Sequence, residues 1–411
     1  MQMFSGLQYI EMDVASSFGL DKNTWQERLD WFQAKKKFHE FATGPELVAF
    51  CRGAEEPAQA LAGILAWRAA MFKQPTGYLC GMDATASGLQ LLALLAGDEA
   101  AGAICNLVAT GRREDAYKAV HELVDRLMGT SSVIDRKAVK SALMTHLYGS
   151  KAEPKKCFGV DTPELAAFYE AVEKLLPGAD QLNKDLISLW DPTALAHCWT
   201  LPDGFEVVVK VMATVEHQVE FLGRKYAVME KVNQPQIQGL SMGANIIHSI
   251  DGLVVREMNR RCNYNLGKIT RVLDVLQGEG LGTAVSRDKD IQLLRIIELE
   301  ESTGFLPAVI FEYIDFENAG HIDGRLCCKI VELYNSLPEK AFPVICIHDC
   351  FKFHPNYGND VRIQYKQILS ELAGSTVLDY IATEIRGQPV RVTKISNNMP
   401  QLIQESEYAL S

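Results

Sequence analysis

The chain has no long uncharged apolar run and no excess of positive charge, and each absence excludes a class of protein. No apolar run reaches the length of a membrane span, and the start at Met1 lacks a basic segment followed by an apolar stretch. We therefore expect a soluble protein that is not exported. The net charge is -11, from 52 acidic and 41 basic residues. This balance argues against holding nucleic acid through bulk charge, so any such contact must be local.

The cysteines are poorly spaced for metal or disulfide chemistry. The 10 cysteines contain no Cys-x-x-Cys pair, and Cys327 and Cys328 are adjacent. Neither a zinc ribbon nor a disulfide framework fits this spacing. The sequence therefore predicts reduced thiols in a cytosolic compartment.

Length and patterning predict two interlocked domains with mixed secondary structure. The 411 residues exceed one ordinary domain, and an apolar content of 47% supplies a core. Periodicity predicts helices over residues 21–32, 57–72, 87–95, 115–127 and 135–148. Buried strands are predicted at 78–80 and 343–347, an extended hairpin over 201–235, and two helices after residue 349.

Two lone acids each follow a predicted buried strand. Asp83 comes after the first strand, and Asp349 follows His348 directly after the second. One aspartate after an apolar run is more often a turn or cap residue than a ligand. A His-Asp pair after a buried strand, however, puts charge where a fold normally avoids it. Strand ends that present one acid each, with a mostly helical block between them, indicate a split domain with an insertion.

A cationic stripe lies between the two acids. Arg136, Lys140, Met144 and Tyr148 recur every four residues and so share one face of a helix. Arg136 stands in the first turn, where the helix dipole disfavours a cation unless an anion is bound nearby. A triphosphate would supply that anion, and a solvated basic face is the alternative. The aromatic ring of Tyr148, followed by Gly149, is suited to packing against a base pair.

Six ordered motifs resemble the single-subunit RNA polymerases of phage and mitochondria. The run from Asp83 to Gln90 is similar to that family's first palm motif, Asp-Gly-x-x-Ser-Gly-[Ile/Leu]-Gln, with Ala84 in place of the first glycine. The segment 136–150 is similar to its fingers helix, and Ile347 to Phe351 to its second metal-binding motif. The other matches are Gly19-Leu20-Asp21-Lys22 with Trp25 and Glu27-Arg28, Thr200 to Phe205, and Asn245 to Gly252.

The resemblance implies a two-metal nucleotidyl transfer. Asp83 and Asp349 would hold two Mg²⁺ ions, with the Ala84 carbonyl as an additional ligand. The ions would activate the RNA 3′-hydroxyl and stabilise the leaving pyrophosphate. Arg136, Lys140 and Lys22 would neutralise the triphosphate.

The resemblance also implies roles at the nucleotide. Tyr148, with Gly149 beside it, would stand at the nucleotide-binding position and act in choosing ribose. His248 would contact the ribose or the minor groove, and His348 would position Asp349. His321 also lies in a run that resembles the histidine motif; His248 is preferred because its neighbours on both sides match as well.

Gly88 bears on the choice of sugar. It stands where related DNA polymerases carry a glutamate that blocks a 2′-hydroxyl, so RNA synthesis is favoured over a pol I-like DNA polymerase or primase. A non-catalytic nucleic-acid-binding subunit is a further alternative. The presence of both acids together with Arg136 and Lys140 argues against it.

By the same resemblance, the expected fold is α+β: a right-hand polymerase palm, formed by an antiparallel sheet with flanking helices. The palm would comprise residues 1–99 and 249–411, and mostly helical fingers 100–248. The hairpin at 201–235 takes the place of the family's specificity loop, where Arg224, Lys225 and His217 are candidates for DNA contact. The alternative is a strand pair that packs on the fingers. The stretch 265–342 is expected to be an inserted subdomain.

The family's N-terminal promoter domain and thumb lie upstream of the palm, and this chain begins at about the palm. We therefore expect both parts to be absent and a second subunit to supply them, as in the heterodimeric RNA polymerase II of N-four-like phages, whose larger subunit the chain resembles. The expected partners are DNA template, RNA product, rNTPs, that subunit and a recruiting single-stranded-DNA-binding protein. The expected location is the cytoplasm of the infected bacterial host. The ending Glu405 to Ala409 is similar to the family's aromatic-Ala ending, but no role is assigned to it.

Overall fold

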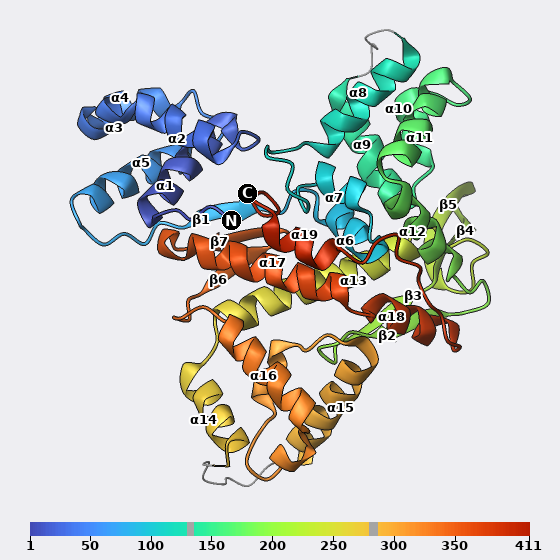
Figure 1. The fold of residues 1–411 in the computed structure, drawn as a ribbon. Coiled ribbons are helices and arrows are strands. Elements are labelled where there is room, and N and C mark those ends of the chain that lie inside the picture. The colour runs from blue at the N-terminus through green and yellow to red at the C-terminus, as the bar shows by residue number, and fades with distance from the viewer. Residues whose placement is uncertain (130–134, 279–286) are drawn as a thin grey trace.

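A small antiparallel sheet joins two distant parts of the chain. The computed structural model describes residues 1–129, 135–278 and 287–411. Strands β1 (Cys80–Asp83), β6 (Val344–Ile347) and β7 (Cys350–Phe353) form a sheet in the order β1-β7-β6. Asp83 pairs with Cys350, and Ile347 also pairs with Cys350 from the other side. Helical groups surround this sheet on several sides (Figure 1).

The two helices expected after residue 349 are present, but strand β7, which was not predicted, comes before them. This strand buries Phe351 and Phe353 and leaves the residues between them less buried, which is the two-residue period of a strand. Four residues are too few for that period to be recognised in the sequence. The helices α17 (Gly358–Gly374) and α18 (Val377–Arg386) then follow, after the short 3-10 turn Pro355–Tyr357.

The N-terminal part is helical. Its elements are α1 (Gly6–Ala15), the π-helix η1 (Ser16–Leu20), α2 (Trp25–Ala34), α3 (Lys36–Phe41), α4 (Gly44–Cys51) and α5 (Pro57–Met71). The helix predicted over 57–72 is confirmed, whereas the one predicted from residue 21 begins at Trp25. Thr24 sets this start, because it accepts the N–H of Glu27 while the Glu27 carboxylate accepts the N–H of Thr24.

Of the helices described between residues 87 and 188, three match predicted ranges closely and the other four were not predicted. The three are α6 (Ser87–Ala96), α8 (Ala116–Met128) and α9 (Arg136–Leu147), and the others are α7 (Glu99–Ile104), α10 (Ala152–Phe158), α11 (Pro163–Leu175) and α12 (Pro177–Ser188). The side chain of Asp115 caps α8 and that of Asp135 caps α9 by accepting backbone N–H groups of the first turn. The predicted N-cap role of Asp135 is thus confirmed.

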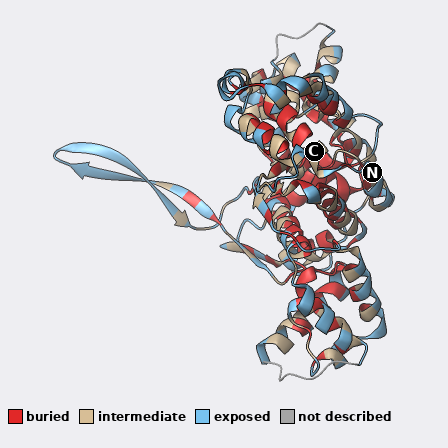
Figure 2. Cartoon of the chain, turned by 90° about the vertical axis from the view of Figure 1, so that its left-hand side faces the viewer, coloured by how far each residue is buried: buried red, intermediate tan, exposed pale blue. Residues whose placement is uncertain are grey.

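The single hairpin expected over 201–235 is wrong, because the structure has two ribbons. Strands β2 (Ala196–Thr200) and β3 (Glu206–Lys210) form one, and β4 (Met212–Phe221) and β5 (Arg224–Asn233) form the other. Val211 separates them, is buried, and donates its N–H to the carbonyl of Leu195 at 2.9 Å. The β4-β5 ribbon projects from the body with nearly all of its residues exposed (Figure 2). It therefore does not pack as a strand pair on the neighbouring helices.

Two apolar clusters hold the described residues together. The first runs from the N-terminal helices through α13 (Met242–Cys262) to α19 (Met399–Glu405). The second lies within α14 (Leu266–Leu276), α15 (Arg287–Thr303), the 3-10 turns Ala308–Glu312 and Ala319–His321, and α16 (Gly324–Ser336). These elements form a lobe of their own in Figure 1. The mixed helical and sheet architecture agrees with the α+β class.

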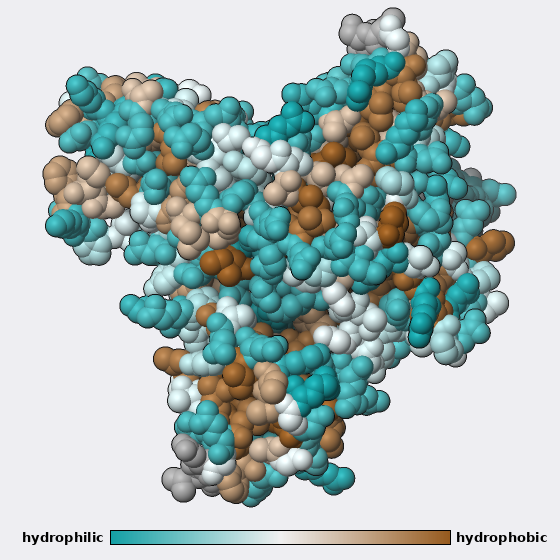
Figure 3. Space-filling view, viewed as in Figure 1, coloured by the Kyte–Doolittle hydropathy of each residue, from teal (hydrophilic) through white to brown (hydrophobic). Residues whose placement is uncertain are grey.

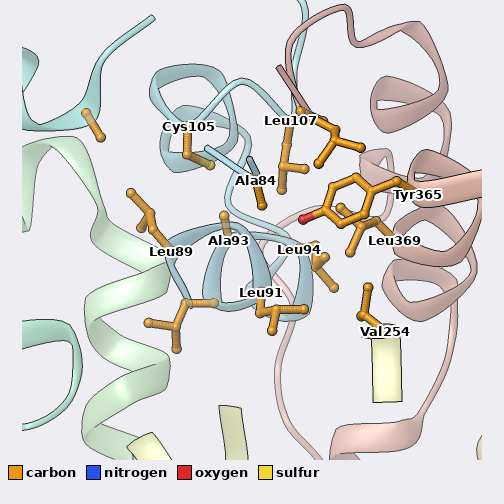
Figure 4. Packing of buried hydrophobic residues seen from close by; sticks show 14 of the residues in the cluster. Ala84, Leu89, Leu91, Ala93, Leu94, Cys105, Leu107, Val254, Tyr365 and Leu369 are labelled. Atoms are coloured by element: carbon orange, nitrogen blue, oxygen red, sulfur yellow. The ribbon is translucent and has the colours of Figure 1, made fainter. Parts of the chain in front are cut away.

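Helix α6 lies at the centre of the first cluster. Its leucines pack against Val254 of α13 and against Tyr365 and Leu369 of α17 (Figure 4). The Tyr365 hydroxyl donates to Gln90 Oε1 at 2.8 Å. A helix buried on all sides has little freedom to move. The N-terminus of α6, which follows Asp83 by a few residues, is therefore held in place relative to the sheet.

Among the described residues, no helix combines the length and the apolar character that crossing a membrane requires.

The buried ring of His39 predicts a loss of stability in acid. Its centroid lies 4.6 Å from that of Phe32, and within the described part of the chain neither ring nitrogen has a hydrogen-bond partner. Burial, helped by Lys35 and Arg68, lowers its pKa from 6.5 to about 4. Because the folded pKa lies below the unfolded one, the stabilisation is complete above pH 6.5 and is lost as the pH falls toward 4.

His39→Phe should remove this dependence. Between pH 7 and pH 4 the unfolding free energy of the wild type should fall by about 2 to 3 kcal/mol more than that of the variant, measured by urea denaturation. His217→Phe, at an exposed position, is the matched control and should behave as the wild type. Equal pH dependence in wild type and His39→Phe would contradict the assignment.

Candidate functional site

The sheet places two carboxylates at one cavity. β1 ends at Asp83, and Asp349 occupies the turn just before its partner strand β7. The N–H of Ala84 donates to the Asp349 carbonyl at 3.0 Å, which ties the two segments together. Both acids line a cavity of about 350 Å³. Burial, with the nearby Asp83 as a smaller cause, raises the pKa of the Asp349 carboxyl.

This cavity also gathers cations and the tyrosine expected from the sequence. Figure 3 shows the surface hollowed between the N-terminal helices and the lobe of α8 and α9, with hydrophilic residues around the hollow. The residues expected at the site that line the cavity are Lys22, Asp83, Ala84, Gly88, Arg136, Lys140, Tyr148 and Asp349. They come from four separate segments of the sequence.

Helix α9 turns its cationic face toward the cavity. Arg136, Lys140, Met144 and Tyr148 all line it, so the shared helix face is as predicted. The Arg136 guanidinium pairs with the Asp115 carboxylate. The Lys140 ammonium lies 5.4 Å from the ring centroid of Tyr117 and forms no ion pair with the described residues. These positive groups stand opposite the two acids and make the cavity suited to a metal-bound anion.

Gly88 and Tyr148 are in close contact. A Cβ on residue 88 would lie 2.5 Å from the Tyr148 hydroxyl oxygen and 3.1 Å from Cζ. The glycine thus allows the tyrosine ring to rest on the first turn of α6. The ring centroid of His248 lies 4.8 Å from that of Tyr148. Burial, together with Asp251 and Asp349, raises the pKa of the Tyr148 hydroxyl.

Two residues near this contact were not expected from the sequence. Asp251, on α13, has its pKa raised to about 6 by burial and by Asp349. Tyr117 lines the cavity, and burial together with Asp115 raises its pKa to about 12. Asp251 follows His248 by three residues on α13, so both lie on one face of the helix. This spacing is the sequence signal that could have indicated Asp251 as a neighbour of the site.

The strand that carries Asp83 is supported from behind by Asp13. This carboxylate is buried and accepts the N–H of Gly81 at 3.1 Å and the Gln59 side-chain amide at 3.1 Å. It also accepts the Tyr78 hydroxyl. Because the Gly81 bond comes from β1 and the Tyr78 bond from the segment before it, Asp13 ties this strand to α1.

The last residues of the chain extend the pairing of β1. Ser411 donates its N–H to the Asp83 carbonyl at 3.0 Å, and Thr85 donates its N–H to the Ala409 carbonyl at 3.3 Å. The Gln90 side chain donates to the Ala409 carbonyl at 2.9 Å. No role was assigned to this segment from its sequence, yet it contacts the Asp83 turn directly.

Several residues expected at the site lie elsewhere. Gly149 has φ +84°, and a Cβ there would lie 2.2 Å from the Leu240 carbonyl, so the glycine is needed for the chain path after α9. His348 has φ +55° in the turn between β6 and β7, and its side chain is exposed. Neither residue lines the cavity.

The remaining basic and histidine candidates do not line the cavity either. Arg224, Lys225 and His217 lie on the projecting β4-β5 ribbon, where His217 pairs with Glu230 at 3.1 Å. His321 lies in the second lobe and pairs with Asp290 at 3.1 Å. Of the two histidines considered, His248 is the one in contact with Tyr148.

The donor set fits magnesium. Asp83 and Asp349 offer carboxylate oxygens and Ala84 a carbonyl, which are the hard ligands that Mg²⁺ prefers. Across residues 1–129, 135–278 and 287–411, no group of three or more His, Cys, Asp or Glu side chains is placed to hold a metal. Two carboxylates suffice for Mg²⁺, because it keeps waters and binds substrate phosphates for its other positions.

Part of the sequence is similar to a known family of enzymes. Residues 4–154 match the family described as DNA-dependent RNA polymerase. This range contains Asp83, Gly88, Arg136, Lys140 and Tyr148.

Two curated relatives are similar over part of their length. The DNA-directed RNA polymerase of Pseudomonas phage phiKMV is 27% identical over 60% of this chain and 37% of its own. The mitochondrial DNA-directed RNA polymerase of Neurospora crassa is 32% identical over 35% of this chain and 12% of its own. The chain therefore spans well under half the length of these relatives.

The contact between Gly88 and Tyr148 can be tested by stability. Gly88→Ala should lower the unfolding free energy by about 1 to 3 kcal/mol, because its Cβ overlaps the tyrosine hydroxyl. In a Tyr148→Phe background the same substitution should cost less, since the nearest atom is gone. Urea denaturation of the four proteins measures the coupling. Strictly additive effects would show that the two residues do not touch as described.

Proposed function

We propose that this chain catalyses template-directed RNA synthesis on DNA, transferring a nucleotide from an rNTP to an RNA 3′ end with release of pyrophosphate. The observation that carries the proposal is the single cavity lined by Asp83, Asp349, Arg136 and Lys140. Phosphoryl transfer needs carboxylates for metal ions and cations for phosphates. The similarity of residues 4–154 to DNA-dependent RNA polymerases supports the same reaction.

The acids are proposed as the metal ligands. Asp83, Asp349 and the Ala84 carbonyl would hold two Mg²⁺, which when bound supply activation of the 3′-hydroxyl and stabilisation of the pyrophosphate. Their positions are fixed by the sheet pairing and by the Ala84 to Asp349 hydrogen bond. His348 serves only to shape the turn that presents Asp349, since its own side chain points to solvent.

The cations are proposed to bind the triphosphate. Lys140 has no carboxylate partner among the described residues, so its charge is available to a phosphate. Arg136 must exchange Asp115 for a phosphate, while Lys22 lies 3.9 Å from Asp21 and is mostly exposed. A bound phosphate is therefore stabilised most by Lys140, and Arg136 and Lys22 can then also bind it.

The sugar is proposed to bind beside the contact between Tyr148 and the first turn of α6. The close approach of Tyr148 to Gly88 leaves no space for a larger residue at position 88, and the His248 ring centroid lies 4.8 Å from that of Tyr148. A glutamate at position 88, as in related DNA polymerases, would displace the tyrosine. This arrangement favours ribose selection by Tyr148, with His248 as a further contact and Gly149 holding the chain behind it.

We assign the palm to residues 1–99 and 249–411 and the fingers to 100–248. Support comes from the sheet, which draws strands from both proposed palm segments, and from α9, which faces it across the cavity. The β4-β5 ribbon is proposed to contact DNA through Arg224, Lys225 and His217, since it projects from the body. Lobe residues 265–342 are proposed as an insertion in the palm, because they pack around their own cluster.

Partners beyond template, RNA and rNTPs rest on the resemblance alone. We propose a second polymerase subunit and a recruiting single-stranded-DNA-binding protein, working in the cytoplasm of an infected bacterium. Primer extension by the purified chain, with and without lysate of infected cells, tests this. Full promoter-dependent activity of the chain alone would refute the need for a second subunit.

Replacing either acid should abolish catalysis. Asp83→Ala and Asp349→Ala are each expected to lower single-nucleotide extension of an RNA primer on a DNA template by at least roughly a thousand-fold, because one metal ligand is lost. The circular dichroism spectrum and the melting temperature should change little. Asp30→Ala, at an exposed position on α2, is the matched control and should retain full activity. Full activity in either acid variant would refute the metal assignment.

Removing the tyrosine hydroxyl should relax sugar choice. Tyr148→Phe should raise incorporation of dNTP relative to rNTP by roughly ten-fold, because the group nearest to Gly88 and the sugar is lost. Competition between GTP and dGTP for the same template position measures the ratio. Tyr169→Phe, which lies outside the cavity, serves as control. An unchanged ratio would remove Tyr148 from sugar selection.

A further inference from the structure

Arg113 is a cation of the cavity that the sequence motifs did not assign. It lies in the segment before α8 and lines the same cavity as Asp83, Asp349 and Lys140. Its side chain is partly buried, and burial lowers the pKa of its guanidinium. Asp83, Asp21 and Asp115 are close enough to oppose that shift. Arg113 bonds to Ser411, whose N–H donates to the Asp83 carbonyl, so Arg113 lies on the Asp83 side of the cavity.

The guanidinium of Arg113 has no carboxylate partner in the described part of the chain. Its Nε donates instead to the Ser411 hydroxyl at 3.1 Å. The neighbouring cations are different, since Arg112 pairs with Glu114 at 2.6 Å and Arg136 pairs with Asp115. A partly buried positive charge without a counter-ion raises the free energy of the folded protein, and a bound anion would offset that cost. Only one of the donor groups of Arg113 is used by Ser411, so the others remain for a ligand.

The position of Arg113 indicates which anion it meets. A second cavity adjoins the first, and Lys22, Arg113 and Arg136 line both, together with Glu114 and Asp115. These two acids pair with Arg112 and Arg136, so Arg113 keeps its charge where the first cavity passes into the second. A negatively charged group longer than a single phosphate can bridge the two spaces. The terminal two phosphates of a triphosphate have that charge and length.

We propose that Arg113 binds the β- and γ-phosphates of the incoming rNTP and then the pyrophosphate product. The planar guanidinium donates two parallel hydrogen bonds to phosphate oxygens, and the bond to Ser411 orients it toward the cavity. Ser411 also donates its N–H to the Asp83 carbonyl, so one short segment positions both the acid and the arginine. This inference rests on the proposed function and adds a named residue for the leaving group.

The test compares two arginines that carry the same charge. Arg113→Gln removes the inferred contact, and Arg113→Lys keeps the charge without the two parallel hydrogen-bond donors. Arg126→Gln removes an exposed charge that lines neither cavity. Calorimetric titration of the full chain with inorganic pyrophosphate in Mg²⁺ measures binding directly. Primer extension on a preformed RNA–DNA hybrid gives the KM for the next rNTP, and thermal melting reports the fold.

Arg113→Gln should weaken pyrophosphate binding and raise the KM by roughly ten-fold or more, the loss expected for a charge-assisted hydrogen bond. Arg113→Lys should lie between this variant and the wild type, and Arg126→Gln should match the wild type. The inference is overturned if Arg113→Gln binds pyrophosphate as the wild type does, if both glutamine variants lose affinity equally, or if the wild type binds none. If Arg113→Gln does not fold, Arg113→Lys decides: several-fold weaker pyrophosphate binding supports the role and unchanged binding refutes it.

The two proposals can fail separately. A wild-type chain that binds pyrophosphate through Arg113 but does not extend an RNA primer would contradict the proposed polymerase activity and leave the phosphate contact standing. A chain that extends primers with unchanged pyrophosphate affinity in Arg113→Gln would contradict only the role of Arg113.

Discussion

The pairing of β1 with β7 is the interaction on which the site depends. It sets Asp83 opposite Cys350 and brings Asp349, from the far end of the sequence, to the same edge. A slip of one residue would turn Asp83 to the other face of the sheet, so the register decides whether two carboxylates can share a metal. Four residues per strand cannot hold that register by themselves. Three surrounding hydrogen bonds also hold the register. Gly81 donates its N–H to the Asp13 carboxylate, Ser411 donates its N–H to the Asp83 carbonyl, and Ala84 donates its N–H to the Asp349 carbonyl.

The second constraint is the contact of α9 with α6. Gly88 lets Tyr148 lie directly on the first turn of α6, and the buried leucines of α6 fix that turn in the core. The cationic face of α9 is therefore held at a defined distance from the acids. The cavity is acidic at the sheet and basic at α9 and Arg113. The pairing of β1 with β7 and the contact of α9 with α6 together produce this distribution of charge.

The sequence allowed the local features of the site to be predicted. The N-cap at Asp135, the shared face of Arg136, Lys140 and Tyr148, and the strand ends at the two acids all follow from patterns within about a dozen residues. The long-range features could not be predicted in this way. Strand β7, the division of 201–235 into two ribbons, Asp13, and the contact of Arg113 with Ser411 depend on segments that meet only in the folded chain. Single polar residues such as Asp13 carry no periodic signal, so nothing in the sequence marked them.

The central claim is that Asp83 and Asp349 hold metal at one site. Fe²⁺ bound in place of Mg²⁺ reduces added hydrogen peroxide to hydroxide and a hydroxyl radical close to the metal, and added ascorbate returns the Fe³⁺ to Fe²⁺. Mapping the resulting backbone cleavage tests the claim directly. The account predicts cuts near residue 83 and near residue 349 in the same sample, both suppressed by excess Mg²⁺ and both absent in Asp349→Ala. Cleavage near only one of the two acids, or cleavage that Mg²⁺ does not suppress, would contradict a shared metal site.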